Sequence, residues 1–220
     1  MVGMPKISDA RRAERREQIL NAAWSCFQKE GLHATTMDDI ISASGLSAGA
    51  VYSYFPSKEA LIFAAVTTSL SGIRDLLEPL LRRDPLPSPD LFLRDVAAAI
   101  ERFTTREGFD LKRLALLGWS EAQRNEQLQV TMRGFYVAFR DQLAQAVKIW
   151  ARTGVIDPKA SPDSVSKLLL SVILGFVVQA ALLGDVTPAA IGRGITQLSA
   201  SSRPRPQTQR SVTTKRDRDS

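Results

Sequence analysis

The sequence has very few of the side chains that build metal centres, disulfide frameworks and nucleophilic triads. Its 220 residues include one cysteine, Cys26, and one histidine, His33. A single cysteine excludes an intrachain disulfide and fits a reducing compartment. A single histidine excludes a histidine-rich metal site, and a serine–histidine–aspartate triad would have to use His33 itself. We therefore predict no metal, no cofactor and no catalytic residue. We expect Cys26 to pack in a first helix rather than act as a redox sensor, and His33 to lie at the surface.

A secretion signal is also missing, because the first residues contain no apolar segment of the kind that a signal peptide requires. One apolar run, residues 168–184, is a candidate membrane span. It falls short of the about 20 residues that cross a bilayer, it includes Ser171 and Gln179, and it lacks basic flanks. A helix that is apolar all round can also lie inside a protein. We expect a buried helix in a dimer, no membrane association and a cytoplasmic location; a membrane-associated helical adaptor is the alternative.

Positive charge is in excess, but the excess lies mostly at the end of the chain. The net charge is +6, yet residues 1–60 contain seven basic and seven acidic side chains, whereas residues 201–220 contain six and two. Net charge therefore gives no support for nucleic-acid binding by the N-terminal region. Four arginines within residues 11–16 nevertheless form a basic arm ahead of the first predicted helix, which could neutralise phosphates. A solvated N-terminus is the alternative.

Capping residues, prolines and glycines predict an all-α chain. Three helices should begin where a capping residue precedes proline, at Ser88-Pro89, Ser161-Pro162 and Thr187-Pro188. Proline at the first helical position loses no hydrogen bond, because that N–H has no partner within the helix. No alternating β pattern of useful length occurs. The predicted helices cover residues 10–30, two short segments within 36–55, and then 57–81, 89–106, 110–124, 126–152, 162–183 and 188–200.

Residues 35–58 have the layout of a helix-turn-helix DNA reader. Thr36 can cap a first helix, and Asp39 stands at the spacing of a capping box, with aspartate in place of glutamate or glutamine. Gly45 can end that helix in a left-handed conformation. Ser47 can cap the second helix. A helical hairpin that only packs is the alternative.

The second helix of this motif carries groups suited to DNA. Residues 48–50 leave a small, smooth face that can approach a duplex closely, and the hydroxyls of Tyr52 and Tyr54 suit phosphate. After the break at Pro56, Lys58 lies in the first turn of the next helix, where free N–H groups and the helix dipole also favour an anion.

The order of residues in this region resembles the N-terminal domain of tetracycline-repressor-type (TetR) transcription regulators. The similar stretch is RREQILNAAWSCFQKEGLHATTMDDIISASGLSAGAVYSYFPSKEALI, and the resemblance covers roughly residues 13–73. It implies a three-helix DNA-binding domain and an all-helical C-terminal domain. It also implies a homodimer and a small-molecule effector that releases the protein from a DNA operator.

The resemblance also implies roles for individual positions. The residues that it places at the DNA are Thr36, Ser47, Ala48, Gly49, Tyr52, Ser53, Tyr54 and Lys58. Thr36, Tyr52, Tyr54 and Lys58 would contact phosphates, with Tyr54 also a candidate for a base edge. Ala48 and Ala50 depart from the family, in which longer polar or basic side chains are common at these positions. Base reading here would then rest on thymine-methyl contacts, serine hydroxyls and DNA shape.

The two last helices have more apolar surface than one chain needs. Ser171 and Gly175 lie four residues apart, which would let a partner helix approach closely. We predict a two-fold dimer, which would place two recognition helices in successive major grooves of a roughly palindromic operator. The predicted interface consists of Ser171, Leu174, Gly175, Val178, Leu182, Ile191, Ile195 and Leu198.

Aromatic and apolar residues between residues 103 and 139 are candidates to line an effector site. They are Phe103, Leu114, Leu117, Trp119, Met132, Phe135, Tyr136 and Phe139. The alternative for each is an ordinary core position. The composition of this set favours an apolar or aromatic small molecule.

The sequence thus predicts four segments and one function. The segments are a basic arm (1–12), a helix-turn-helix domain (13–56, motif 36–55), a helical ligand-binding and dimerisation domain (57–200) and a disordered basic tail (201–220). The predicted function is that of a sequence-specific, homodimeric DNA-binding regulator, a repressor released by its ligand. The alternatives are an all-α small-molecule-binding enzyme and a helical adaptor that reads no DNA.

Overall fold

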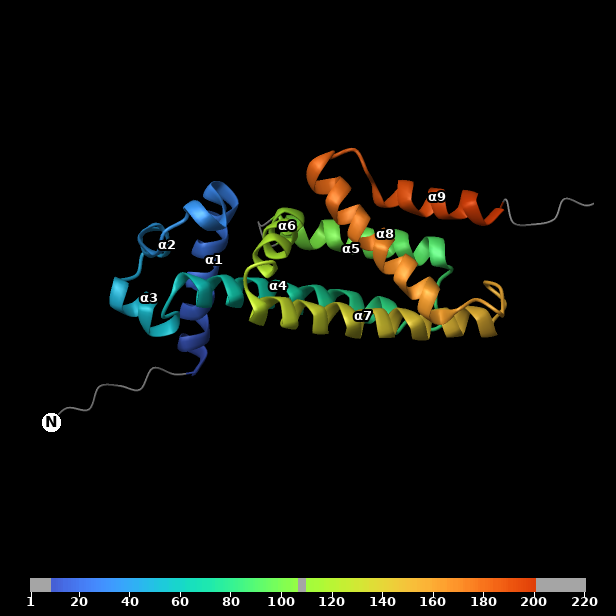
Figure 1. Ribbon diagram of the computed structural model, residues 1–220, viewed down its shortest axis with the longest axis horizontal. Coiled ribbons are helices and arrows are strands. Elements are labelled where there is room, and N and C mark those ends of the chain that lie inside the picture. Colours follow the sequence, from blue (N-terminus) through green and yellow to red (C-terminus); the bar gives the residue numbers. More distant parts are fainter. Residues whose placement is uncertain (1–8, 107–109, 201–220) are drawn as a thin grey trace, which may run out of the picture.

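The computed structural model describes residues 9–106 and 110–200, and within these ranges the chain forms nine helices and no strand (Figure 1). This confirms the all-α prediction. The predicted tail and the first eight residues of the predicted basic arm lie outside the described residues. The helices are α1 (Asp9–Ala34), α2 (Met37–Ser44), α3 (Ala48–Tyr54), α4 (Lys58–Leu81), α5 (Pro89–Arg106), α6 (Leu111–Ala122), α7 (Glu126–Arg152), α8 (Pro162–Leu182) and α9 (Pro188–Ala200).

Local capping chemistry sets most helix starts. The Ser57 hydroxyl accepts from the Ala60 N–H at 3.2 Å before α4, and the Ser161 hydroxyl accepts from the Ser164 N–H at 3.3 Å before α8. Each bond satisfies a first-turn donor that has no partner within the helix. Helices α5, α7 and α9 have the predicted bounds.

The first helix begins one residue before its predicted start and ends later than predicted. Because it begins at Asp9, the arginines of residues 11–16 lie on the helix itself, and the prediction that they form a basic arm ahead of it is wrong. Arginine and glutamate are good helix formers, and opposite charges three or four residues apart support a helix. Gly31, the predicted end, breaks the helix with φ 82° and ψ 166°, but one more turn follows. Leu32 in that turn is buried, at 6% exposure, which ties the turn to the core.

The core of the protein has two main parts, joined by α4. We call α1–α3 with the first turns of α4 the head, and the remainder through α9 the body. The head core contains Ile19, Leu20, Ala23, Phe27, Ile40, Val51, Phe55, Leu61 and Ile62. The body core contains Leu77, Phe92, Leu93, Val96, Leu143, Val147, Trp150, Ile173 and Phe176. Because α4 contributes to both cores, this continuous helix connects head and body (Figure 1).

Cys26 is partly buried against the head core, where burial raises the pKa of its thiol, with Asp39 as a second cause. A raised pKa lowers the thiolate fraction and the reactivity of the sulfur. The side chain therefore serves packing, as expected.

Two helices, α4 and α8, are long and apolar enough to cross a membrane by length and composition alone. Core helices of soluble proteins pass the same test. Helix α8 buries one side in the body core through Leu169, Ile173 and Phe176 and leaves apolar side chains on its other side, with Leu168 61% and Leu182 67% exposed. The outer side of α8 is the part of this helix that lacks a partner within the described chain.

Candidate nucleic-acid interface and body cavities

A complete capping box fixes the start of α2. The Thr36 hydroxyl oxygen accepts from the Asp39 N–H at 3.2 Å, and Asp39 accepts from the Thr36 N–H at 2.8 Å and from the Thr36 hydroxyl at 2.6 Å. The predicted box is therefore confirmed, with aspartate in the place of the usual glutamate. Thr36 is exposed, as a phosphate contact requires, but its hydroxyl already serves the box.

The capping box makes the head sensitive to acid. The hydrogen bonds from Thr36 hold the pKa of Asp39 below its usual value. A carboxylate with a lowered pKa stabilises the fold above the unfolded-state value of about 3.9, and this stabilisation is lost as the pH falls through the folded-state value. Asp39→Asn should therefore be less stable than the native protein at pH 7, and the difference should shrink toward pH 3. Urea unfolding across this pH range measures it; a pH-independent difference would contradict this role of Asp39.

A side chain of α1 stabilises the turn between α2 and α3. Gly45 adopts the left-handed conformation (φ 66°) predicted for it. The Gln18 side-chain amide of α1 donates to the Ser44 carbonyl at 2.7 Å, and the Ser44 hydroxyl accepts from the Leu46 N–H at 3.2 Å. Gln18 thus positions the end of α2 and the turn on which the angle of α3 depends.

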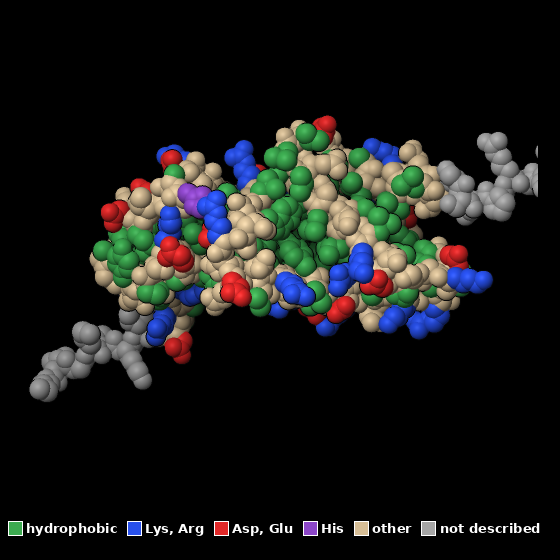
Figure 2. Space-filling model, viewed as in Figure 1, with side chains coloured by type: hydrophobic (Ala, Val, Ile, Leu, Met, Phe, Trp, Pro, Cys, Tyr) green, Lys and Arg blue, Asp and Glu red, His purple; other side chains and the backbone are tan. Residues whose placement is uncertain are grey.

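Helix α3 turns an exposed, small-residue face outward. Val51 points inward and is 0% exposed, and Tyr54 is partly buried against the head core. The Ser47 hydroxyl caps the helix by accepting from the Ala50 N–H at 3.3 Å, while Ser53 donates to the Ala50 carbonyl at 2.6 Å. The exposed positions are Ser47, Ala48, Gly49, Tyr52 and Ser53. Figure 2 shows hydrophobic side chains gathered at this tip of the head. The predicted DNA-facing residues of α3 therefore lie on one accessible face.

Lys58 is the predicted DNA contact with the most internal partners. Its ammonium donates to the carbonyl of Thr35 at 2.9 Å and to that of His33 at 3.1 Å. These bonds tie the first turn of α4 to the end of α1, directly before α2. An ammonium has three donors, so one remains for another acceptor. With Gln18, Lys58 holds α2 at both ends.

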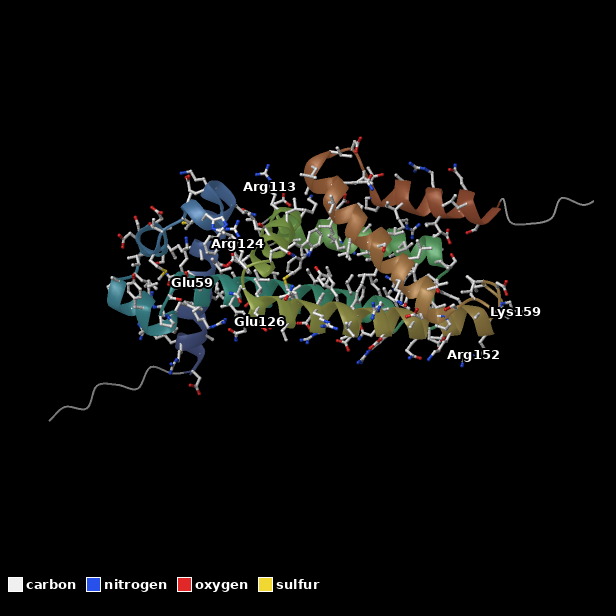
Figure 3. All side chains as sticks on the ribbon, in the orientation of Figure 1. Glu59, Arg113, Arg124, Glu126, Arg152 and Lys159 are labelled. Atoms are coloured by element: carbon white, nitrogen blue, oxygen red, sulfur yellow. The ribbon has the colours of Figure 1, made fainter. Side chains whose placement is uncertain are left out.

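A side-chain contact joins head and body close to the hydrogen bonds of Lys58. Arg124, just after α6, lies 3.0 Å from the His33 imidazole nitrogen Nε2, and Leu117 of α6 packs against the head core. Figure 3 shows Arg124 between α1 and the end of α6. Sequence spacing could not find this contact, because the two residues are 91 positions apart and no motif connects them. Helix α6 is therefore a second connection between head and body.

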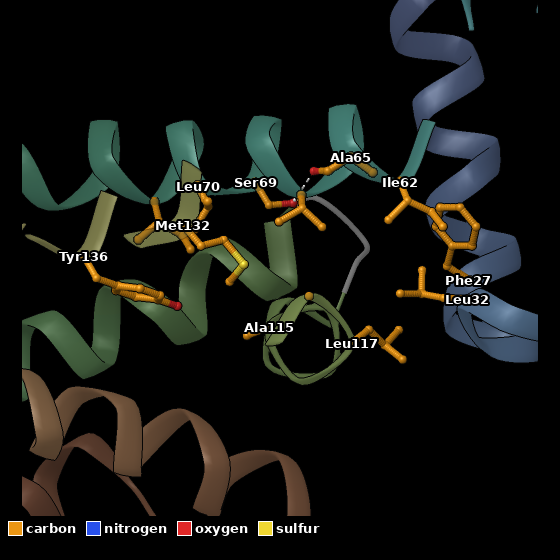
Figure 4. Close-up of a pocket in the computed structure, with 13 residues that line it drawn as sticks. Phe27, Leu32, Ile62, Ala65, Ser69, Leu70, Ala115, Leu117, Met132 and Tyr136 are labelled. Carbon is orange, nitrogen blue, oxygen red and sulfur yellow. Dashed lines mark hydrogen bonds between the residues drawn. The ribbon is translucent and has the colours of Figure 1, made fainter. Parts of the chain in front are cut away.

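Within the described residues, two small cavities are lined by predicted effector-site residues. The first, of about 40 Å³, reaches from Phe27 and Leu32 of the head to Leu117, Met132 and Tyr136 (Figure 4). The second, of about 50 Å³, is lined in part by Trp119, Phe135, Tyr136 and Phe139. The Tyr136 hydroxyl accepts from the Trp119 indole N–H at 2.8 Å, and burial raises the pKa of Tyr136. None of the described residues that line either cavity is charged.

Most of the predicted effector-site residues line these spaces. Phe103 is the exception: its ring packs against Gly72, where an added Cβ would stand 2.8 Å from the ring. The side chain of Leu114 lies outside the described residues. The structure thus brings together Leu117, Trp119, Met132, Phe135, Tyr136 and Phe139.

The predicted dimer residues divide into two groups. Ile191 and Ile195 of α9 are partly buried against the body core of their own chain. Leu182 and Leu198 are 67% and 74% exposed, and Ser171 is exposed. An added Cβ at Gly175 would meet nothing within 4 Å. We call the outer side of α8 with Leu198 the α8–α9 face. Figure 2 shows hydrophobic side chains in a band over α6 and α8.

Comparisons with known proteins agree with this architecture. Residues 19–65 match the sequence family described as "Bacterial regulatory proteins, tetR family", and residues 93–198 match "BetI-type transcriptional repressor, C-terminal". The chain is 29% identical over 161 residues to the HTH-type transcriptional regulator UidR of Escherichia coli K12. The aligned region covers 73% of this chain and 78% of UidR. Head and body therefore both match families of bacterial transcription regulators.

Solved structures show the same fold. Salmonella enterica GusR superposes with a TM-score of 0.67 at 25% identity, covering 88% of this chain and 98% of GusR. A putative transcriptional regulator from Saccharomonospora viridis, solved in complex with choline, superposes with a TM-score of 0.70 at 19% identity, covering 86% of this chain and 97% of that protein. At that identity the second comparison concerns the fold alone.

Proposed function

The chain belongs to the tetR family of bacterial regulatory proteins, and we propose that it is a ligand-released repressor that binds a palindromic DNA operator as a homodimer. The observation that carries this proposal is the outward face of α3. Its small and hydroxyl-bearing side chains are exposed while Val51 behind them is fully buried. In this proposal residues 13–56 bind DNA, residues 57–200 bind the ligand and the second chain, and the protein acts in the cytoplasm.

The head would bind DNA through contacts from a few individual side chains and not through a net positive charge. Residues 1–60 have as many acidic as basic side chains. Contacts to phosphate would come from Tyr52, from the remaining donor of Lys58 and from Tyr54. The exposed Thr36 would contribute only if its hydroxyl hydrogen turned from Asp39 to the phosphate. Base reading would come from Ser47, Ser53 and the close approach that Ala48 and Gly49 allow. Two heads are needed because each one offers few contacts.

The α8–α9 face would supply the dimer. Its apolar side chains are exposed in the single chain, and hydrophobic burial is the main driving force of association. Ser171 and Gly175 leave room for the backbone of a second α8. A two-fold axis through this face would pair each α8 with its counterpart in the partner.

The switch would use α4 and α6 together. Both helices line the first cavity, and both contact the head, α4 through Lys58 and α6 through Leu117 and Arg124. A ligand that favours a wider spacing between these helices would shift the population toward heads spaced wrongly for the operator. If a saturating effector left operator affinity unchanged, this switch would be excluded.

A gel shift with the DNA that flanks the protein's own gene tests the function. The full-length protein should retard a specific fragment in the presence of excess unrelated DNA. An all-α enzyme or adaptor would show no such preference.

Lys58 and Ser47 should differ in their effects on DNA binding. Lys58→Ala should weaken binding to all DNA sequences, and the magnitude of the salt slope should fall by about one unit or less. Its stability should also fall, since two carbonyls lose their donor. Ser47→Ala should instead change the preference among operator variants, with Ser47→Thr as a control that keeps the capping hydroxyl. Fluorescence anisotropy at several salt concentrations measures both. Equal, sequence-blind losses would rule out base reading by Ser47.

A further inference from the structure

An open groove runs along the seam between α4 and α7. We call it the α4–α7 groove. Thr67 and Thr131 line it toward the starts of the two helices, and Arg74 and Gln142 line it further along them. It holds about 330 Å³, which lies within the range of about 300–1,000 Å³ that is typical of small-molecule sites. The two cavities of about 40 and 50 Å³ are each far smaller than that range.

Some side chains that line this groove also line one of the two smaller cavities. Leu70 lines the groove and the first cavity, while Phe135 and Phe139 line the groove and the second. Tyr136 lines both cavities. The groove is therefore separated from each cavity by shared side chains. Rotation of these side chains would connect the larger, partly polar groove with apolar, uncharged space between the helices.

Charge is distributed unevenly between these spaces. Among the described residues that line the groove, Arg74 is the one charged side chain and none is a carboxylate. Its guanidinium Nε lies 3.5 Å from the neighbouring carboxylate of Asp75, but both side chains are exposed, so this pair is weak. The two terminal nitrogens of Arg74 can still bind a carboxylate through two parallel hydrogen bonds. The groove thus favours an anion over a cation, while a charge inside the cavities would have no partner.

We propose that the α4–α7 groove is the effector site and that the effector is an amphipathic small molecule with a single carboxylate. Its carboxylate binds Arg74 in the groove, and its apolar tail passes Leu70 and Phe135 into the two smaller apolar cavities. The Tyr136 hydroxyl accepts from Trp119 and can still donate its own hydrogen. A wholly apolar ligand would make no use of Arg74 or of the side-chain amide of Gln142. This inference rests on the proposed function, since it names the class of effector.

Occupation of the groove would act directly on the head. A tail between α4 and α7 moves these helices apart, and the first turn of α4 holds the end of α1 through Lys58. The same tail reaches the cavity lined by Leu117 of α6, which packs against the head core. Ligand binding would therefore act on α4 and α6, the two helices that contact the head and through which DNA release is proposed to occur.

Calorimetry on the full-length protein without DNA tests the site, with octanoate, octan-1-ol and octylammonium as probes. Octanoate should bind at least about tenfold more tightly than the other two, because an ionised hydrogen bond contributes on the order of a tenfold gain. Arg74→Gln should weaken octanoate binding about tenfold and leave octan-1-ol unchanged. The proposal is overturned if octanoate binds no more tightly than octan-1-ol, or if Arg74→Gln binds octanoate as the native protein does.

Gly134 offers a second, independent pair of variants. It lines the groove, and an added Cβ would meet nothing within 4 Å. Gly134→Phe should fill the groove and reduce octanoate affinity more than tenfold, whereas Gly134→Ala should keep it. Alanine favours the helix over glycine, and urea unfolding checks that both variants fold. Octanoate binding to Gly134→Phe at native affinity would place the ligand elsewhere.

Failure of this inference and failure of the proposed function give different results. If the protein retards no specific DNA but binds octanoate through Arg74, the function is wrong and the site stands. If it binds a specific operator but shows no carboxylate preference, the function stands and the ligand class is wrong.

Discussion

Leu182→Lys should convert the protein from a dimer to a monomer and weaken operator binding by about a hundredfold or more. Leu182 is 67% exposed in the single chain, and lysine in the last turn of a helix suits the helix dipole, so the monomer should remain folded. In the dimer the ammonium would be buried without a partner, at a cost that exceeds what one apolar contact contributes. Loss of the second head then removes an avidity gain of about 10²–10⁴.

Val130→Lys is the matched control for this substitution. Val130 is also an exposed apolar residue, at 64%, but it lies on α7, away from the α8–α9 face. Analytical ultracentrifugation should show a native-like dimer for Val130→Lys and a monomer for Leu182→Lys. A dimeric Leu182→Lys protein that binds the operator normally would place the dimer on another surface.

Trp150→Ala should cause the largest loss of stability, about 3–5 kcal/mol. Trp150 is 1% exposed in the body core, and its ring packs edge-on against Phe92 at 5.6 Å between centroids. Its indole N–H donates to the Pro87 carbonyl at 2.8 Å, which ties the connection between α4 and α5 to α7. Truncation would leave a cavity and an unpaired carbonyl.

Trp150→Phe separates these two contributions. It keeps an aromatic ring against Phe92 and loses the hydrogen bond to Pro87, so about 1–2 kcal/mol should be lost. Urea unfolding at a fixed protein concentration measures both variants, because dimerisation makes stability depend on concentration. Equal losses from the two variants would mean that the ring volume contributes little.

Local chemistry accounts for the part of the fold that the sequence predicts. Ser161-Pro162 and Thr187-Pro188 mark helix starts because a capping hydroxyl and a fixed proline φ act within one turn. The capping box of Thr36 and Asp39 is local for the same reason. The turn after Gly31 was not predicted, since burial of Leu32 continues a helical turn where glycine alone would end it.

Contacts between distant residues account for what the sequence does not predict. Gln18 and Ser44 lie 26 positions apart, and Lys58 and Thr35 lie 23 apart. The sequence shows that Lys58 is the first residue of a helix. Only the packing of α4 against α1 shows that its ammonium donates to two backbone carbonyls. The aromatic residues that line the two small cavities were identified in the sequence by type and position. The groove beside them, and with it the role proposed for Arg74, depends on how α4 and α7 lie together.

Selection of bound fragments from random DNA, followed by sequencing, tests the central claim most directly. Two α3 helices related by a two-fold axis should enrich an inverted repeat with half-sites about one helical turn, roughly 10 base pairs, apart. Leu182→Lys should fail to enrich this repeat at the same protein concentration. Recovery of no common sequence, or of single half-sites by the native protein, would contradict a dimeric DNA reader built on α3 and the α8–α9 face.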